Sequence, residues 1–285
     1  MMTIWTIGWT VTRRVLIAIA ATSAMMLASA QGHAQAVYPN PGAAADALVE
    51  AVATSDDQAL ARVLGRDYRS LVPDGVSQDD IYAFLGAAAQ QRTLMAGAGN
   101  AVLLSVGVHG WTFPVPMVPT ARGWHFDLAA GRREISRRAM GRNELAAIDV
   151  LFQLATAQQD YIARGAGQGY ARKLVSARGT TDGLYWPAAD GEPASPVGPA
   201  AWAMLPDTPV ADAFYGYRFS IVPISASRYA MLAWPAQPRK SGVHMFVYLS
   251  SSRMLERVSD GRIPTASSLN ALFDGVVGDW REIAL

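Results

Sequence analysis

The chain has 285 residues, a net charge of +1 and 51% hydrophobic residues, and it contains no cysteine. The absence of cysteine excludes disulfide bonds, a lipoprotein anchor, thiol catalysis and zinc sites with cysteine ligands. A nearly neutral chain gives no electrostatic reason to expect nucleic acid or an anionic membrane surface as a partner. We therefore expect a protein whose stability depends on its hydrophobic core.

The first 36 residues have the pattern of a cleaved secretory signal. Arg13 and Arg14 supply the positive charge, and residues 15–30 form an apolar stretch that is too short for a membrane span. This pattern predicts export to the periplasm or the medium by the general secretory route. The paired arginines leave the twin-arginine route as the alternative.

Ala34-Gln35-Ala36 is the predicted cleavage site, because small residues stand at its first and third positions. Cleavage there makes Val37 the first residue of a mature chain of about 249 residues, and cleavage after Ala30 is the alternative. The signal carries two arginines and no acidic residue, so its removal takes the net charge to about −1.

Residues 37–130 predict an N-terminal α+β domain in which helices precede strands. Asn40 and Ser77 are suited to N-cap positions, and Pro41 to the first position of a helix. Prolines place the middle of three strands at a sheet edge, or make it an extended segment outside the hydrogen-bonded ladder. The expected helices cover residues 40–52, 56–65 and 77–85, and the expected strands cover residues 101–108, 112–119 and 123–128.

Residues 131–285 predict a second domain, which begins with a long helix from about residue 132 to residue 164. At 100° per residue, Glu144 falls on an apolar stripe, and Arg137 lies two turns earlier on the same face. A loop, a short helix, an antiparallel meander and a final helix follow. The stripe consists of Glu144, Ile148, Leu151, Ala155 and Ile162, with Leu145 and Phe152 beside it. The later segments are the loop 176–199, the helix 200–205, the strands 217–224, 229–234, 243–249 and 254–258, and the helix 265–273.

Motifs rich in glycine, proline, aromatic and paired charged residues are spread over the mature chain. They include Gly110-Trp111-Thr112-Phe113-Pro114, Trp124-His125-Phe126-Asp127, Gly141-Arg142-Asn143-Glu144, Asp182-Gly183-Leu184-Tyr185-Trp186-Pro187 and Gly216-Tyr217. In combination they resemble the exported bacterial family called domain of unknown function 2950. The resemblance implies export and an α+β shape, and it implies no particular activity.

Two features depart from the family pattern. Members usually carry two arginines, an aliphatic residue and glycine before the Asn-Glu pair, whereas this chain has Arg138-Ala139-Met140-Gly141. The connection after Ile224 is also shorter than in typical members. Separately, the order of long helix, loop, meander and final helix resembles the soluble part of a type II secretion pseudopilin. The pilin-type leader is absent, so we expect no pilin-like assembly through the long helix.

Glu144 and the polar residues beside it form the first candidate site. A carboxylate on an apolar helix face could act as a general acid or base. The alternative, which we favour, is a buried Arg–Glu pair that fixes how the helix crosses the sheet, because nucleophiles and metal ligands are scarce nearby in the sequence. The residues concerned are Arg137, Arg138, Arg142, Asn143 and Glu144. Trp124 and Asp127 are expected to be structural as well.

The segment from Asp182 to Pro187 is the second candidate. An acid with Tyr185 and Trp186 on a glycine-containing loop is suited to binding a small molecule or peptide. The alternative is a loop that covers the sheet with its two aromatic rings, while Asp182 and Gly183 make the turn.

Histidines give no metal site. His125 and Asp127 share one face of a strand, but two ligands are too few, and His109 and His244 are isolated. No nucleophile elbow, phosphate-binding loop or dinucleotide motif occurs. We therefore expect neither metal nor cofactor.

Three functions are left open. The first is a non-catalytic exported protein that binds an envelope protein or small ligand, or takes part in envelope assembly. The second is a periplasmic hydrolase or ligand-binding enzyme that uses Glu144 or Asp182. The third is an accessory protein of a secretion or pilus-like apparatus.

Overall fold

The computed structural model describes residues 35–72, 76–165, 169–188 and 190–283. Most of the predicted signal segment, residues 1–34, lies outside the described residues. The chain divides into two units, one ending at Ile135 and the other beginning at Ser136, within helix α5 (Leu128–Ala163). The domain boundary expected from the sequence, between residues 130 and 131, falls nearer the start of the same helix.

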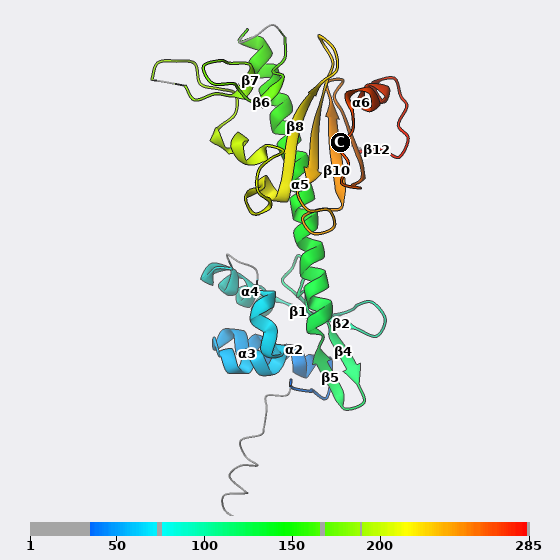
Figure 1. Ribbon diagram of the computed structural model, residues 1–285. Coiled ribbons are helices and arrows are strands. Elements are labelled where there is room, and N and C mark those ends of the chain that lie inside the picture. The colour runs from blue at the N-terminus through cyan, green and yellow to red at the C-terminus, as the bar shows by residue number, and fades with distance from the viewer. Residues whose placement is uncertain (1–34, 73–75, 166–168, 189, 284–285) are drawn as a thin grey trace, which may run out of the picture. The chain divides into compact units, whose positions relative to one another are not determined.

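Unit 1 packs three helices and one 3₁₀ helix against an antiparallel sheet (Figure 1). The sheet order is β1-β2-β4-β5, with β3 paired to β2. The buried side chains that join helices to sheet include Leu48, Leu104, Met117 and Phe126. The helices are α2 (Pro41–Ala53), α3 (Asp57–Leu64), η1 (Arg66–Leu71) and α4 (Gln78–Gln90), and the strands are β1 (Arg92–Ala96), β2 (Val102–Val106), β3 (Trp111–Thr112), β4 (Met117–Thr120) and β5 (Gly123–Phe126).

The predicted helix starts in unit 1 are confirmed. The Asn40 side chain accepts a hydrogen bond from the amide of Ala43 at 2.8 Å, and Ser77 forms a capping box with Asp80. These caps satisfy amides that have no partner inside the helix. The segment expected as one strand at 112–119 is divided into β3 and β4, because residues 113–116 between them include two prolines that cannot donate to a sheet. The expected sheet-edge position is wrong for β4, which lies between β2 and β5.

Unit 2 is built on an antiparallel sheet with the order β12-β11-β10-β9-β8. The predicted meander is therefore confirmed over its four main strands. A parallel pair, β6 and β7, and three short 3₁₀ helices precede the sheet. In chain order, the elements of unit 2 that follow α5 are β6 (Lys173–Val175), β7 (Gly183–Tyr185), η2 (Pro199–Met204), η3 (Val210–Asp212), η4 (Phe214–Gly216), β8 (Tyr217–Pro223), β9 (Tyr229–Pro235), β10 (His244–Leu249), β11 (Arg253–Val258), α6 (Ala266–Phe273) and β12 (Arg281–Glu282).

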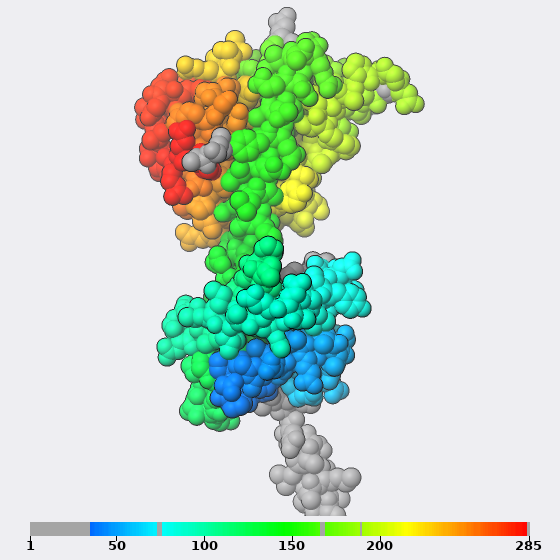
Figure 2. Space-filling model, turned by 180° about the vertical axis from the view of Figure 1, so that it is seen from behind, coloured from blue at the N-terminus to red at the C-terminus, as the bar shows by residue number. Residues whose placement is uncertain are grey.

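Helices cover both faces of this sheet. Side chains of α5 and β9 such as Leu151 and Met231 share one buried cluster, while Leu232 of β9 and Leu269 of α6 share another. All seven residues of β9 are consequently buried. In unit 2, Figure 2 shows α5 between the C-terminal residues and the yellow-green segment that precedes β8, with its outer face uncovered.

The α+β class predicted from the sequence is confirmed. The predicted face of α5 is partly wrong, because Leu145 and Ile162 are 69% and 44% exposed. The helix instead buries a stripe that passes through Leu151, Leu154 and Tyr161. None of the helices in the described ranges combines the length and hydropathy that a membrane span requires.

Candidate functional site

Glu144 lies on α5 where the helix meets the beginning of β10. Its Oε1 atom accepts hydrogen bonds from the amides of Val243 at 2.7 Å and His244 at 3.0 Å. The same oxygen lies 3.3 Å from Nδ1 of His244. The Glu144 and His244 side chains are 20% and 31% exposed. The carboxylate is thus largely enclosed, while part of the imidazole stays accessible.

The partners described for Glu144 are not the ones expected from the sequence. Its described hydrogen bonds come from Val243 and His244, and the expected pairing with arginines of its own helix stays a prediction. The physical reason is that two adjacent amides at the start of β10 point at one carboxylate oxygen. Hydrogen bonds from amides to an ionised acceptor are stronger than those between neutral groups.

Neighbouring residues hold residues 241–244 from two further sides. The Asn143 amide nitrogen donates to the carbonyl oxygen of Ser241 at 2.9 Å, and the Tyr217 hydroxyl donates to that of His244 at 2.8 Å. Burial, followed by the Glu144 charge, raises the pKa of Tyr217 above its ordinary value of 10.0, which keeps this hydroxyl protonated. Segment 241–244 is therefore fixed by α5 and by β8.

Two glycines allow this close approach. A Cβ atom on Gly242 would lie 2.0 Å from the Tyr217 hydroxyl oxygen. Gly216 has a positive φ of 71°, and a Cβ atom there would lie 2.8 Å from Cβ of Ser241. A side chain at either position would thus displace the segment that Glu144 binds.

The chemistry that this arrangement permits is proton transfer by the imidazole of His244. A carboxylate beside Nδ1 can fix the orientation of an imidazole, leaving Nε2 to accept or donate a proton. Sequence reasoning missed His244, because it is isolated in the sequence and its partner lies 100 residues away. No local signal could have identified it.

Asp182 lies in the turn that precedes β7, and three groups occupy its carboxylate. Lys173 Nζ lies 2.5 Å from Oδ2, while the Ala177 amide and the Thr180 hydroxyl bind Oδ1 at 2.9 and 2.8 Å. Lys173, followed by the Ala177 amide, lowers the pKa of Asp182 to about 2. A carboxylate that is ionised and bound in this way stabilises a turn and is a poor proton acceptor near neutral pH.

Tyr185 and Trp186, adjacent in sequence, have different environments. Trp186 is buried, and its Nε1–H donates to the carbonyl oxygen of Pro193 at 3.1 Å. Tyr185 is partly exposed and meets the ring of Trp202 edge-on, with ring centres 6.5 Å apart. Trp202 on η2 is 56% exposed. Sequence reasoning missed Trp202, since nothing in the sequence distinguishes it from the buried tryptophans.

Trp124, His125 and Asp127 belong to unit 1. The Trp124 amide and carbonyl both pair with the backbone of Tyr38 at 2.7 Å, and the Asp127 carboxylate accepts from the Ala130 amide at 2.9 Å near the start of α5. Nδ1 of His125 is buried and lacks a hydrogen-bond partner among the described residues. Among all residues that the structure describes, no group of three or more histidine, aspartate or glutamate side chains is placed to hold a metal ion.

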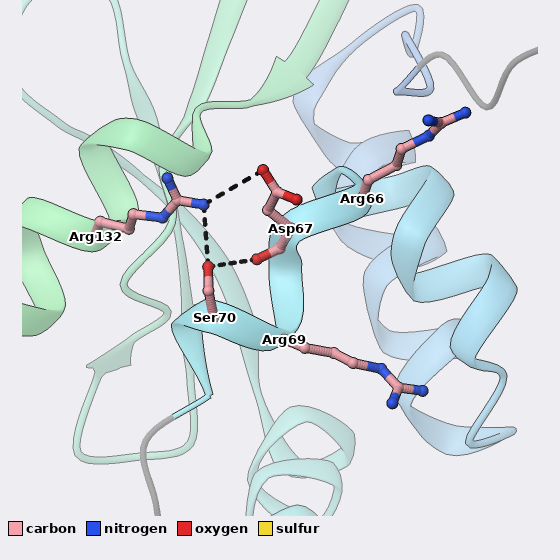
Figure 3. A pocket seen from close by; sticks show the side chains of 5 residues that line it. All are labelled: Arg66, Asp67, Arg69, Ser70 and Arg132. Atoms are coloured by element: carbon pink, nitrogen blue, oxygen red, sulfur yellow. Dashed lines mark hydrogen bonds and ion pairs between the residues drawn. The ribbon is translucent and has the colours of Figure 1, made fainter.

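Unit 1 has an open hollow of about 700 Å³ that is lined by charged and polar residues. Arg132 lies 3.0 Å from the Ser70 hydroxyl and 3.9 Å from the Asp67 carboxylate (Figure 3). Arg66 and Arg69 point away from this cluster, and Arg69 forms an ion pair with Asp57. The arginines therefore do not converge on one ligand position.

Comparisons with known proteins identify a family. A family model described as "Protein of unknown function (DUF2950)" matches residues 35–228. No curated protein and no solved structure matches the chain significantly. The likeness to pseudopilins therefore stays a prediction. The model covers more than half of the chain, so the chain belongs to the DUF2950 family, and the predicted resemblance is confirmed.

Proposed function

We propose that this member of the DUF2950 family is an exported protein of the bacterial envelope that binds a partner without catalysing a reaction. The signal pattern of the first 36 residues supports export to the periplasm. The partner is an envelope protein or a small ligand. The observation that carries the proposal is the exposed, edge-packed ring of Trp202.

Trp202 is held in place although its ring is exposed. Its carbonyl oxygen accepts a hydrogen bond from the Thr208 hydroxyl at 3.1 Å, and Tyr185 supports one edge of the ring. Asp182 in turn fixes the loop that leads to Tyr185. A rigid aromatic side chain offers a large contact area at a small entropic cost, which favours binding.

A second exposed aromatic residue lies on a neighbouring element. Tyr215 is 55% exposed and has a positive φ of 50°, which is unusual for a residue with a side chain. It lies on η4, which contacts η2, the element that carries Trp202. Strained backbone in an exposed aromatic residue is typical of a functional surface. We call Tyr185, Trp202 and Tyr215 the aromatic surface.

The experiment places a photo-crosslinking amino acid at position 202 in cells that lack the native protein. We expect a discrete crosslinked species in the envelope fraction, and its loss when Tyr215→Ala is added. Tyr82 of unit 1, which is 62% exposed, is the control position for nonspecific crosslinking. Equal crosslinking at positions 82 and 202, or none at 202, would refute the proposal.

One observation favours an enzyme as the second candidate. The 3.3 Å contact between Glu144 and His244 is the geometry of a carboxylate that orients a general acid or base. The test compares His244→Gln with the native protein in hydrolysis of chromogenic esters and amides, together with thermal stability. Loss of hydrolysis at unchanged stability would support catalysis, whereas absence of hydrolysis by the native protein at every pH tested would exclude these substrates.

A further inference from the structure

The first described residue, Gln35, is integrated into the fold of unit 1. Its side-chain nitrogen Nε2 lies 2.7 Å from the carbonyl oxygen of Phe126, 3.1 Å from that of Leu64 and 3.2 Å from that of Val63. Val63 and Leu64 end α3, and Phe126 ends β5. One carboxamide thus connects the end of a helix to the end of a strand.

The residues that follow Gln35 continue this attachment. The Ala36 amide donates to the carbonyl oxygen of Arg62 at 2.7 Å, and Tyr38 forms an antiparallel bridge with Trp124 of β5. The last carbonyls of a helix have no partner inside that helix. Gln35 and Ala36 supply partners to three such groups, at residues 62, 63 and 64.

Two cleavage sites in the signal fit the small-x-small rule, and they differ in whether they preserve these contacts. Cleavage after Ala36 removes both Gln35 and Ala36 from the mature protein. Cleavage after Ala30, which follows Ala28 and Ser29, keeps both of them. The family model also begins at residue 35, so it includes the same two residues in the domain.

We infer that the signal is cut between Ala30 and Gln31, and that Gln35 is a structural residue of the mature protein. The inference rests on the proposed export. In the reaction, water adds to the Ala30 carbonyl, the Ala30–Gln31 peptide bond breaks, and the leaving nitrogen takes a proton. The products are a signal peptide that ends in an Ala30 carboxylate and a mature chain with a free Gln31 amine.

A free N-terminal glutamine has a characteristic further reaction. Its amine attacks its own side-chain carbonyl and releases ammonia, which forms a cyclic pyroglutamyl residue without any other reactant. A start at Gln31 therefore produces two related masses, whereas a start at Val37 produces one.

The first test is the intact mass of the protein recovered from the periplasm of cells that express the full chain. We expect the mass of the chain from Gln31, or that mass less one ammonia. Replacing Ala28 by Leu should block this cut. Replacing Ala34 by Leu, the matched control, should leave the cut after Ala30 in place, so that the mature mass changes only by the difference between alanine and leucine. A chain that starts at Val37 or at any other residue overturns this inference and leaves export supported. An uncut chain retained in the cytoplasm overturns both.

The second test measures the contribution of Gln35 directly. Gln35→Ala in the exported chain should lower the melting temperature of unit 1 by several degrees, because three carbonyl oxygens lose the two N–H groups that they share. Gln90→Ala, at an exposed position at the end of α4 in the same unit, is the control and should change it little. Equal melting temperatures for Gln35→Ala and the native protein would overturn the structural role of Gln35.

Discussion

The carboxylate of Glu144 lies 3.3 Å from the imidazole of His244, one hundred residues further along the chain. The same carboxylate oxygen accepts the amide of His244 at 3.0 Å, so one helical side chain holds both the backbone and the ring of the first residue of β10. This contact fixes where β10 begins relative to α5. It is also the one place in the described structure where a carboxylate is seen to orient a histidine ring.

Substitution of Glu144 should separate its hydrogen-bonding role from its charge. Glu144→Ala should lower the free energy of unfolding of unit 2 by about 2–3 kcal/mol, because two amides lose an ionised acceptor. Glu144→Gln keeps an oxygen at the same place and should cost about 1 kcal/mol. Urea denaturation at neutral pH measures both values.

Asp212→Asn, at an exposed position of η3 in unit 2, is the control for the loss of charge alone and should stay within about 0.5 kcal/mol of the native protein. Equal losses for Glu144→Gln and Glu144→Ala would contradict the prediction. They would show that the negative charge, and not the position of the oxygen, holds the segment.

Asp182 should make the stability of unit 2 depend on pH in the acid range. Its folded-state pKa of about 2 lies below its ordinary value of 3.8, so the ionised form stabilises the folded protein. This contribution is complete above about pH 4 and is lost as the pH falls through about 2. Because the side chain is 44% exposed, solvent screening limits the contribution to less than about 1 kcal/mol.

The measurement compares native protein with Asp182→Asn at several pH values between 6 and 2. We expect the native protein to be the more stable at pH 6 and the difference to shrink as the pH approaches 2. Lys173→Gln should reduce the same pH dependence, since Lys173 is the principal cause of the lowered pKa. A difference between native protein and Asp182→Asn that is constant with pH would rule out this contribution.

Two glycines of α5 should respond to alanine in opposite directions. Beyond the neighbouring residues and backbone of α5 itself, a Cβ atom on Gly141 would have no heavy atom within 4 Å, whereas one on Gly131 would lie 2.7 Å from Cγ2 of Val115. Gly141→Ala should therefore stabilise unit 2 by about 0.5–1 kcal/mol through improved helix propensity. Gly131→Ala should destabilise unit 1 by about 1–3 kcal/mol through overpacking.

Thermal unfolding of the two variants tests this contrast. Adding Val115→Ala to Gly131→Ala should recover part of the loss, since it removes the atoms in conflict. Destabilisation by Gly141→Ala would mean that this glycine has a role that the contacts of α5 do not explain.

Much of the fold could be predicted because its signals are local. Asn40 and Ser77 mark helix starts through side chains that bind amides three residues away, and the four-strand meander shows alternating burial in β8. Strand β1 was missed because all five of its residues are exposed, so no apolar alternation marks it. Strands β6 and β7 were missed because each has three residues in a region of glycine and aspartate.

The candidate site was less predictable, because the residues that bind Glu144 are distant from it in the sequence and some of them bind through backbone amides. Glu144 could be recognised as unusual on a helix, but two of its donors are amides, which leave no mark in the sequence. His244 becomes a candidate only in the folded chain, where its ring lies beside Glu144. Trp202 differs from Trp186 by its exposure, which depends on the packing of η2 and β7 rather than on residue type.

Gly242 provides the last prediction. A Cβ atom at this position would lie 2.0 Å from the hydroxyl oxygen of Tyr217 and 2.6 Å from its Cζ atom, and Tyr217 is fully buried. Gly242→Ala must therefore displace Tyr217 or the segment that binds Glu144, and should cost at least about 3 kcal/mol.

Tyr217→Phe alone should cost about 1–2 kcal/mol, because the carbonyl of His244 loses its donor. In the double variant, removal of the hydroxyl relieves the shorter contact, so the combined loss should be smaller than the sum of the two single losses. Urea denaturation of the four proteins measures this coupling, and strictly additive losses would show that the two side chains do not conflict.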